Sequence, residues 1–72
     1  MPLINVKLTP GATPEQKATL VQELTEVLVR VLGKNPASTH VIIEEVSAEN
    51  WGVGGETVAS LRARGAAGVS KG

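Results

Sequence analysis

Apolar and polar residues alternate at the start of the chain. Between Leu3 and Leu8 every second residue is apolar, and Asn5 and Lys7 lie at the positions between them. This alternation predicts a β-strand with one apolar face and one polar face. Thr9-Pro10-Gly11 follows directly and is expected to end the strand.

The spacing then becomes helical. From Pro14 to Leu32 the apolar residues recur three and four positions apart, which predicts an α-helix with a single buried stripe. Thr13 is suited to cap this helix, with Pro14 at its first position and Gln16 completing a capping box. Gly33 is suited to end it. The stripe consists of Leu20, Leu24, Val27, Leu28 and Val31, widened by Val21 and Leu32.

A second strand is expected after a turn at residues 34–38. Residues from His40 to Val46 are rich in β-branched side chains, as strands are. Two strands joined by a long helix make a β-α-β unit, in which the strands are parallel. The expected fold class is therefore α/β (α+β), built on one β-α-β protomer.

Glycines dominate the segment that follows. Residues 49–56 favour a tight hairpin or a backbone that passes close to another chain. They lack the lysine of a phosphate-binding loop, and no helix opens out of a glycine fingerprint. Residues 57–64 are expected to form one or two helical turns. Residues 1–64 are thus interpreted as one domain, and residues 65–72, which have little bulk to bury, as a flexible tail.

The length of the chain indicates that it does not act alone. With 72 residues it forms one small domain, and such a domain buries only ~60% of the surface of its unfolded chain. It has no cysteine to form a disulfide, yet 42% of its residues are hydrophobic. Because oligomerisation is the remaining common route to stability, we expect a homo-oligomer.

Charge and aromatic content exclude several partners. Seven basic residues balance seven acidic ones, and a single Trp is the only aromatic residue of the Phe, Tyr and Trp types, so nucleic acid is not an expected partner. No stretch approaches the ~20 apolar residues of a membrane span, and the N-terminus lacks a signal-peptide pattern. The expected location is the cytoplasm, without membrane attachment.

The most reactive group predicted from the sequence is Pro2. A proline behind Met1 becomes the N-terminus when the methionine is removed, and it then carries a free secondary amine at the start of a strand. An α-amino group titrates near roughly 7.7–8.0, and apolar surroundings lower that value. Pro2 is therefore a candidate general base at neutral pH. The alternative is that it merely starts the chain.

Several segments together resemble a known family. These segments are Met1-Pro2, Thr13-Pro14-Glu15-Gln16-Lys17, Val41-Ile42-Ile43-Glu44-Glu45 and Trp51-Gly52-Val53-Gly54-Gly55-Glu56. Their order and spacing resemble those of the 4-oxalocrotonate tautomerase group of the tautomerase superfamily, from Pro2 to about Arg64 without an obvious gap.

The resemblance implies an assembly and a reaction. Protomers would pair into dimers that share a four-stranded sheet, and three dimers would form a hexamer. Pro2 would be the catalytic base at the rim of a pocket built from neighbouring chains, without a metal or an organic cofactor. The implied reaction is enol–keto (1,3- or 1,5-) proton transfer in a small 2-hydroxydienoate, or another small enol or dienol acid.

Two departures from the family pattern bear on the substrate. Members that act on dicarboxylates carry an arginine after the glycine of the first loop and another at the start of the second strand, and here these positions are Ala12 and His40. Alanine offers no donor, whereas histidine offers one or two and a pH-dependent charge. His40 is interpreted as a polar substrate contact, or else as a solvated or interfacial residue, and a monocarboxylate is favoured. Trp51 falls where the family has an aromatic wall, a role that simple interface packing does not exclude.

Other cations are possible replacements for these arginines. Arg62 is a candidate for substrate binding, because the C-terminal part of one chain can reach the pocket of a neighbour in an oligomer. Arg64, Arg30 and Lys34 are weaker candidates, and solvated surface charge is the alternative for all four.

Two alternative functions remain open. The chain is either a catalytically weak binding or structural oligomer of the same fold, or a catalyst of another proline-dependent reaction such as decarboxylation, dehalogenation or aldol- or Michael-type bond formation. An acid that activates water in related dehalogenases would fall at Val53, so hydration chemistry is not expected. Glu44 and Glu45 are interpreted as alternating strand residues without special chemistry.

Overall fold

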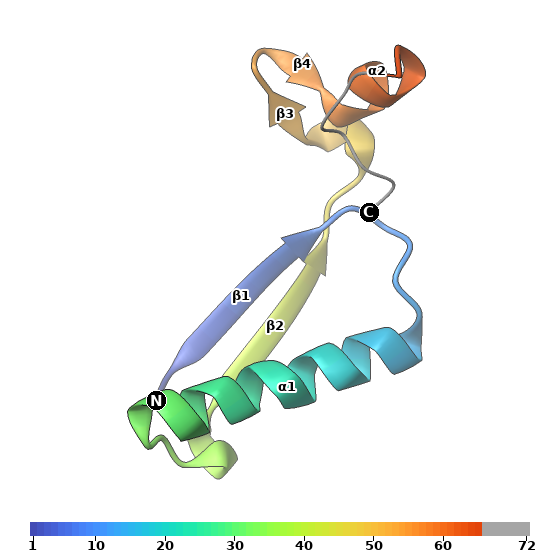
Figure 1. Cartoon of the computed structure of the whole chain (residues 1–72). Helices are drawn as coiled ribbons and strands as arrows, with labels where there is room; N and C mark the ends of the chain where they lie inside the picture. The colour runs from blue at the N-terminus through green and yellow to red at the C-terminus, as the bar shows by residue number, and fades with distance from the viewer. Residues whose placement is uncertain (66–72) are drawn as a thin grey trace. The chain divides into compact units, whose positions relative to one another are not determined.

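A computed structural model describes residues 1–65, which form two compact units (Figure 1). Unit 1 comprises Met1–Lys7 and Ala12–Glu44, and unit 2 comprises Leu8–Gly11 and the chain from Glu45 onward. Each unit is described by itself below. The predicted tail, apart from Gly65, lies outside the described residues.

Unit 1 is the β-α-β unit. Strands β1 (Leu3–Leu8) and β2 (His40–Glu45) pair with each other and point in the same direction, and helix α1 (Pro14–Leu32) connects them through the short 3-10 helix η1 (Pro36–Ser38) (Figure 1). The His40 amide donates to the carbonyl oxygen of Pro2 at 2.9 Å. The parallel pairing is confirmed. The second strand ends at Glu45, one residue before the predicted Val46.

The predicted limits of α1 and both of its caps are confirmed. The Gln16 amide donates to Thr13 Oγ1 at 3.1 Å, and the Thr13 amide donates to Gln16 Oε1 at 2.9 Å, which completes the capping box. At the other end Gly33 has a φ of 67°, in the left-handed region that glycine adopts without strain.

The prediction of a buried stripe on α1 is wrong for this chain by itself. No residue of α1 is buried, and Val31 is 65% exposed. The cause is the width of the sheet. Two strands lie about 4.8 Å apart, whereas a helix with its side chains is about 10–12 Å across, so two strands cover only part of an apolar helix face. Half-buried stripe residues are Leu20, Leu24 and Leu28, and exposed ones are Val21, Val27, Val31 and Leu32.

The two faces of the sheet differ, as the alternation predicted. Ile4, Val6, Leu8, Val41 and Ile43 are half-buried, and Leu3, Asn5, Lys7, His40, Ile42 and Glu44 are exposed. On the exposed face Glu44 Oε1 accepts from Lys7 Nζ at 2.8 Å and from Asn5 Nδ2 at 2.6 Å. The hydrogen bond from Lys7, followed by that from Asn5, holds the pKa of the Glu44 carboxyl below its ordinary value. This face therefore mixes a polar cluster with uncovered apolar side chains.

Unit 2 contains the predicted hairpin and helical turns. After the 3-10 helix η2 (Ala48–Asn50), β3 (Gly52–Val53) pairs antiparallel with β4 (Glu56–Thr57). Gly54 and Gly55 have φ values of 61° and 88°, and a type I′ turn needs positive φ at both central positions. Helix α2 (Val58–Ala63) then starts at a Thr57 cap, whose Oγ1 accepts from the Ser60 amide at 3.1 Å. In the part of the chain that the structure describes, neither α1 nor α2 has the length and apolarity needed to cross a bilayer.

Candidate functional site

Pro2 and His40 lie together at one end of the sheet in unit 1. Pro2 precedes β1 and His40 opens β2, so the parallel pairing brings the two residues to the same edge. The 2.9 Å hydrogen bond between them joins the His40 backbone amide to the Pro2 carbonyl oxygen. Pro2 is half-buried and His40 is exposed. The contact fixes the carbonyl side of Pro2 and leaves its ring nitrogen outside the hydrogen bonds of the sheet.

Met1 determines whether that nitrogen is a base. While Met1 is attached, the Pro2 nitrogen is an amide, whose lone pair is delocalised into the peptide bond. The Met1 residue is 90% exposed, and within residues 1–65 its side chain takes part in no hydrogen bond or ion pair. The bond to His40 uses the carbonyl of Pro2 itself. Removal of Met1 therefore leaves the contact that positions Pro2 in place.

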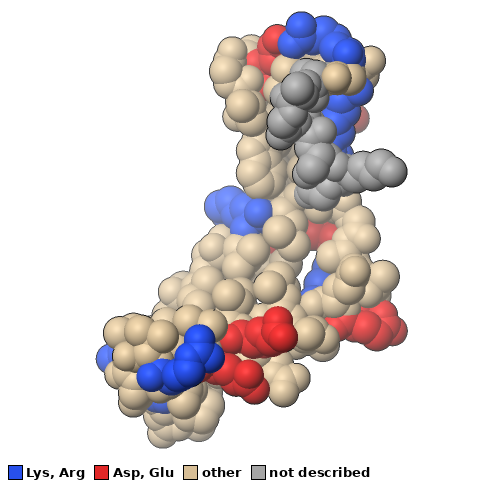
Figure 2. Space-filling view, in the orientation of Figure 1, with Lys and Arg blue, Asp and Glu red and all other residues tan. Residues whose placement is uncertain are grey.

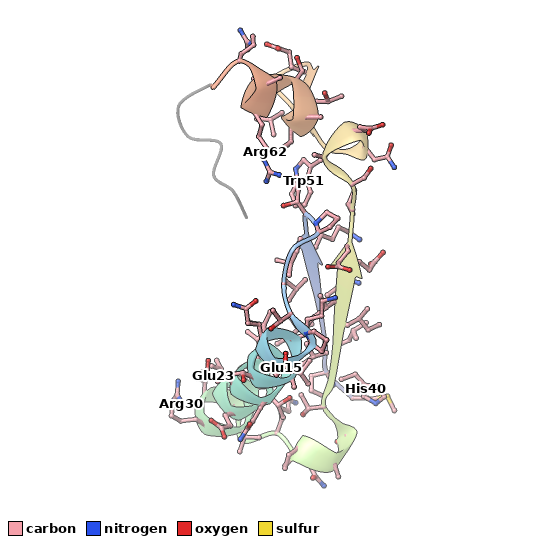
Figure 3. All side chains as sticks on the ribbon, turned by 90° about the vertical axis from the view of Figure 1, so that its right-hand side faces the viewer. Glu15, Glu23, Arg30, His40, Trp51 and Arg62 are labelled. Atoms are coloured by element: carbon pink, nitrogen blue, oxygen red, sulfur yellow. The ribbon has the colours of Figure 1, made fainter. Side chains whose placement is uncertain are left out.

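The imidazole of His40 is available to a ligand. It forms no hydrogen bond or ion pair with any described residue, and Figure 3 shows it on the side of the strands away from α1. The other charged side chains on this face, Lys7 and Glu44, pair with each other at 2.8 Å. His40 therefore presents an imidazole to solvent or to a neighbouring molecule, beside Pro2.

Ala12 supplies no polar group to unit 1. It is half-buried in the loop before α1, and its side chain is a single methyl group. Gly11 before it has a φ of 141°, a backbone conformation that side chains rarely adopt. The first loop therefore offers no cation at this position.

Trp51 belongs to unit 2. It follows η2 and is half-buried, and its carbonyl oxygen accepts from the Val58 amide at 2.7 Å. Its indole N–H has no hydrogen-bond partner among residues 1–65. The backbone of Trp51 is thus held against the start of α2, and the ring keeps an unused donor.

Arg62, also in unit 2, is engaged within the chain. Its Nη2 donates to Thr9 Oγ1 at 3.1 Å, and Thr9 is one of the least exposed residues, at 7%. The Arg62 Nε is buried and has no partner in the described chain. The sequence suggested Arg62 as a free cation, but part of its guanidinium holds the segment after β1. Thr9 was missed, because nothing in a strand-ending Thr-Pro-Gly indicates a partner 53 residues away.

The predicted site residues thus form two pairs. Pro2 and His40 lie in unit 1, and Trp51 and Arg62 lie in unit 2, where Figure 3 shows their side chains in the same region. Of the weaker candidates, Arg64 Nη2 is paired with Glu56 Oε1 at 2.6 Å, and Arg30 lies exposed in the last turn of α1.

Two further observations concern the surface of α1 and the metal-ligating residue types. A shallow surface depression on α1 is lined by Glu15, Gln16, Thr19, Leu20 and Glu23. With two carboxylates and no cation, it is unsuited to an acidic substrate. Residues 1–65 hold no group of three or more His, Cys, Asp or Glu side chains that is placed to bind a metal ion.

Comparison with known proteins gives a consistent result. Residues 2–60 match the model of the family described as tautomerase enzyme. The chain is 52% identical over 63 residues to a probable tautomerase of Dickeya dadantii (strain 3937), covering 86% of this chain and 94% of that relative.

Solved structures agree with the sequence relatives. The crystal structure of TomN, a 4-oxalocrotonate tautomerase homologue in the tomaymycin biosynthetic pathway, matches with a TM-score of 0.83 and 42% identity, over 86% of this chain and 95% of that one. A heterohexamer 4-oxalocrotonate tautomerase from Chloroflexus aurantiacus J-10-fl matches with a TM-score of 0.79 and 34% identity, over 86% of this chain and 100% of that one.

Proposed function

The chain belongs to the tautomerase family, in its 4-oxalocrotonate tautomerase group, and from this premise we propose that it is an isomerase whose Pro2 amine acts as general base. The reaction is enol–keto proton transfer in a small enol or dienol acid. The observation that carries the proposal is the family match that begins at Pro2, the residue whose carbonyl is fixed by His40 while its nitrogen stays outside the sheet hydrogen bonds.

The chemistry requires one proton and no change of oxidation state. After Met1 is removed, the lone pair of the Pro2 nitrogen takes the proton of the substrate hydroxyl, and the enol oxygen becomes a carbonyl. The resulting ammonium returns a proton to a carbon of the conjugated system, and the amine is restored. A positioned general base of this kind contributes typically 10²- to 10⁴-fold to the rate.

The other site residues bind and position the substrate. His40, beside Pro2 and without a partner in the described chain, donates to the substrate carboxylate or to the developing carbonyl. Trp51 supplies an apolar wall, and the part of the Arg62 guanidinium not bound to Thr9 supplies a further cation. Arg62 is then the one permanent cation of the proposed site, whereas family members that act on dicarboxylates have two arginines. One permanent cation favours a monocarboxylate over a dicarboxylate.

Self-association completes the proposal. The chain forms a homo-oligomer, most simply a hexamer, and residues 1–64 act as its domain. Support comes from the exposed Val31 and Leu32 of α1 and the exposed Leu3 and Ile42 of the sheet. Uncharged residues also make up most of the surface visible in Figure 2. Exposed apolar side chains on both the helix and the sheet are typical of a surface that contacts another protein.

Intact-mass measurement coupled to an ultraviolet assay tests the proposal. 2-Hydroxymuconate and phenylenolpyruvate, a dicarboxylic and a monocarboxylic enol, are offered to the chain after the mass has shown whether Met1 is present. Pro2→Ala, which leaves a primary amine of different basicity and geometry, should lose most of the activity. The control Pro36→Ala changes a proline in η1 and should retain it.

The same assay separates the alternatives. Buffer-level rates with Met1 removed would favour a binding or structural oligomer of the same fold, an alternative that the absence of a cation at Ala12 keeps open. Consumption of substrate without a keto product would favour a different proline-dependent reaction.

A further inference from the structure

We propose that Thr9 is a positioning residue, whose hydroxyl holds the guanidinium of Arg62 so that the free part of that group binds the carboxylate of the ligand. The proposal rests on the proposed function only in taking the ligand as an acid. In this role Thr9 acts through Arg62 and does not itself touch the ligand.

Arg62 carries a charge that no carboxylate in the described chain neutralises. The only hydrogen bond of its side chain within residues 1–65 is the 3.1 Å contact with the neutral hydroxyl of Thr9. The nearby Arg64, by contrast, is paired with Glu56 Oε1 at 2.6 Å. Arg62 is half-buried, and a charge withdrawn from water is costly unless an opposite charge compensates it. A bound carboxylate supplies that opposite charge.

The three nitrogens of the Arg62 guanidinium have different surroundings. Nη2 donates to Thr9 Oγ1, and Nε is buried without a partner. Nη1 also has no partner among residues 1–65, but it is not buried. Because the guanidinium is planar and rigid, the contact that holds Nη2 also sets the direction of Nη1. Nη1 is therefore the donor that remains for a ligand.

Thr9 itself has a defined position. It is 7% exposed, and the Leu8 carbonyl directly before it accepts from the Val46 amide at 2.7 Å. Threonine is branched at Cβ, which restricts its χ1 rotation. The hydroxyl is therefore held at one place, and its hydrogen bond limits the rotamers that Arg62 adopts.

The backbone that carries Arg62 is also held. The Val58 amide, at the start of α2, donates to the Trp51 carbonyl at 2.7 Å, and Arg62 follows Val58 by one helical turn. Helical side chains lean toward the preceding turn, and Figure 3 shows the Arg62 side chain directed toward Trp51. The indole of Trp51 is therefore suited to report on binding at Arg62.

The expected consequence concerns affinity. Without the Thr9 hydroxyl the Arg62 side chain regains rotational freedom, and a ligand must remove that freedom again when it binds. Ordering one long side chain on binding weakens affinity roughly 2- to 12-fold. Loss of the guanidinium itself should weaken the binding of a carboxylate at least as much, because the charge is then lost as well.

The decisive experiment measures the binding of hexanoate, an unreactive monocarboxylate, by intrinsic fluorescence. Trp51 is the only Trp and the chain has no Tyr or Phe, so the signal comes from unit 2 alone. Thr9→Val should bind hexanoate roughly 2- to 12-fold more weakly than the wild type. Thr9→Ser, which keeps a hydroxyl, should recover most of the affinity. The double variant of Thr9→Val with Arg62→Gln should bind no more weakly than Arg62→Gln alone, since Thr9 acts through Arg62.

Three controls separate positioning from a loss of structure. Hexanamide has the same length without the charge and should bind alike to every variant. Thr19→Val removes a hydroxyl from α1 and should bind hexanoate as the wild type does. The unmodified chain gives a test without any substitution: hexanoate should shift the NMR signal of the Arg62 Nε–H and leave that of Arg64, which is paired with Glu56, unchanged.

The outcomes distinguish this inference from the proposed function. Wild-type affinity in Thr9→Val, additive losses in the double variant, an unshifted Arg62 signal or no hexanoate binding at all would each overturn the inference. Binding that depends on Thr9 in a chain without tautomerase activity would support the inference and contradict only the proposed function. Tautomerase activity together with binding that is indifferent to Thr9 would contradict only the inference.

Discussion

The backbone amide of His40 donates to the carbonyl oxygen of Pro2 at 2.9 Å, so the residue that opens β2 positions the residue that precedes β1. The contact uses no atom that changes when Met1 is removed or when the His40 side chain is replaced. Substitutions at position 40 therefore change the charge and the hydrogen-bond donors of the side chain beside Pro2 and leave the backbone contact to Pro2 in place. Their effects on activity can be attributed to the side chain.

Retention of Met1 is expected to abolish activity. An acylated Pro2 nitrogen is an amide and cannot accept the substrate proton. Chains prepared with and without Met1 should have the same circular dichroism, because Met1 is 90% exposed, but only the processed chains should turn over substrate. Full activity in a sample whose intact mass shows Met1 on every chain would contradict the mechanism.

Replacing the missing arginines is expected to change substrate preference. Ala12→Arg and His40→Arg should together favour 2-hydroxymuconate over phenylenolpyruvate. Each bidentate charge-assisted contact contributes about 1.5–3 kcal/mol, or roughly 10- to 150-fold in the ratio of kcat/KM values, where the pocket accepts the side chain. Gln22→Arg, at an exposed position of α1, is the matched control. An unchanged ratio would place carboxylate recognition elsewhere.

Loss of the Thr9 hydroxyl is expected to destabilise unit 2. Thr9→Val removes the acceptor of Arg62 Nη2 and leaves a part-buried guanidinium with one donor fewer satisfied, at a cost of about 1–3 kcal/mol. Urea unfolding at fixed protein concentration measures the change. Thr19→Val, which removes a hydroxyl bonded at 3.0 Å to the Glu15 carbonyl on the exposed helix surface, should cost less. Equal losses of unfolding free energy in both variants would show that the contact between Arg62 and Thr9 stabilises the fold no more than an exposed hydroxyl does.

The exposed part of the apolar stripe of α1 is expected to form an interface. Analytical ultracentrifugation at micromolar concentration should show a multiple of the 7.4 kDa chain, most simply six. Val31→Lys places a charge on the stripe and should shift the population toward smaller species, whereas Gln22→Lys should not. A well-folded monomer in the unmodified protein would rule out the assembly.

Acidification is expected to weaken the sheet face that carries Glu44. Because Lys7 and Asn5 lower the pKa of Glu44 in the folded chain, their contribution to stability is fully present above the unfolded pKa and is lost as the pH falls through the folded one. NMR titration should place the Glu44 carboxyl below an ordinary glutamate, and Lys7→Gln should move it back upward. Lys34→Gln, outside this cluster, should leave it unchanged. A Glu44 midpoint insensitive to Lys7 would contradict the assignment.

Local signals were sufficient to predict most of the elements. Period-two alternation located β1, Thr13 and Gly33 fixed the ends of α1, and the Gly54-Gly55 pair indicated a hairpin, since each depends on neighbouring residues alone. The buried stripe was wrong, because helical periodicity shows which face is apolar and does not show what covers it. The bond from Arg62 to Thr9 was not predictable, because it joins residues that only tertiary structure brings together.

Because Met1 is exposed, its removal is expected to change the activity of this protein without changing its fold. Since Met1 is 90% exposed and its side chain makes no hydrogen bond or ion pair within residues 1–65, we expect a chain that keeps it to fold in the same way as one that has lost it. Molecular size, secondary structure content and melting temperature would then be the same for chains without Met1 and for chains that keep it. Under the proposed role of Pro2, the specific activity of a preparation is expected to measure its fraction of processed N-termini, and the aminopeptidase that removes Met1 is expected to set how much of the protein is active.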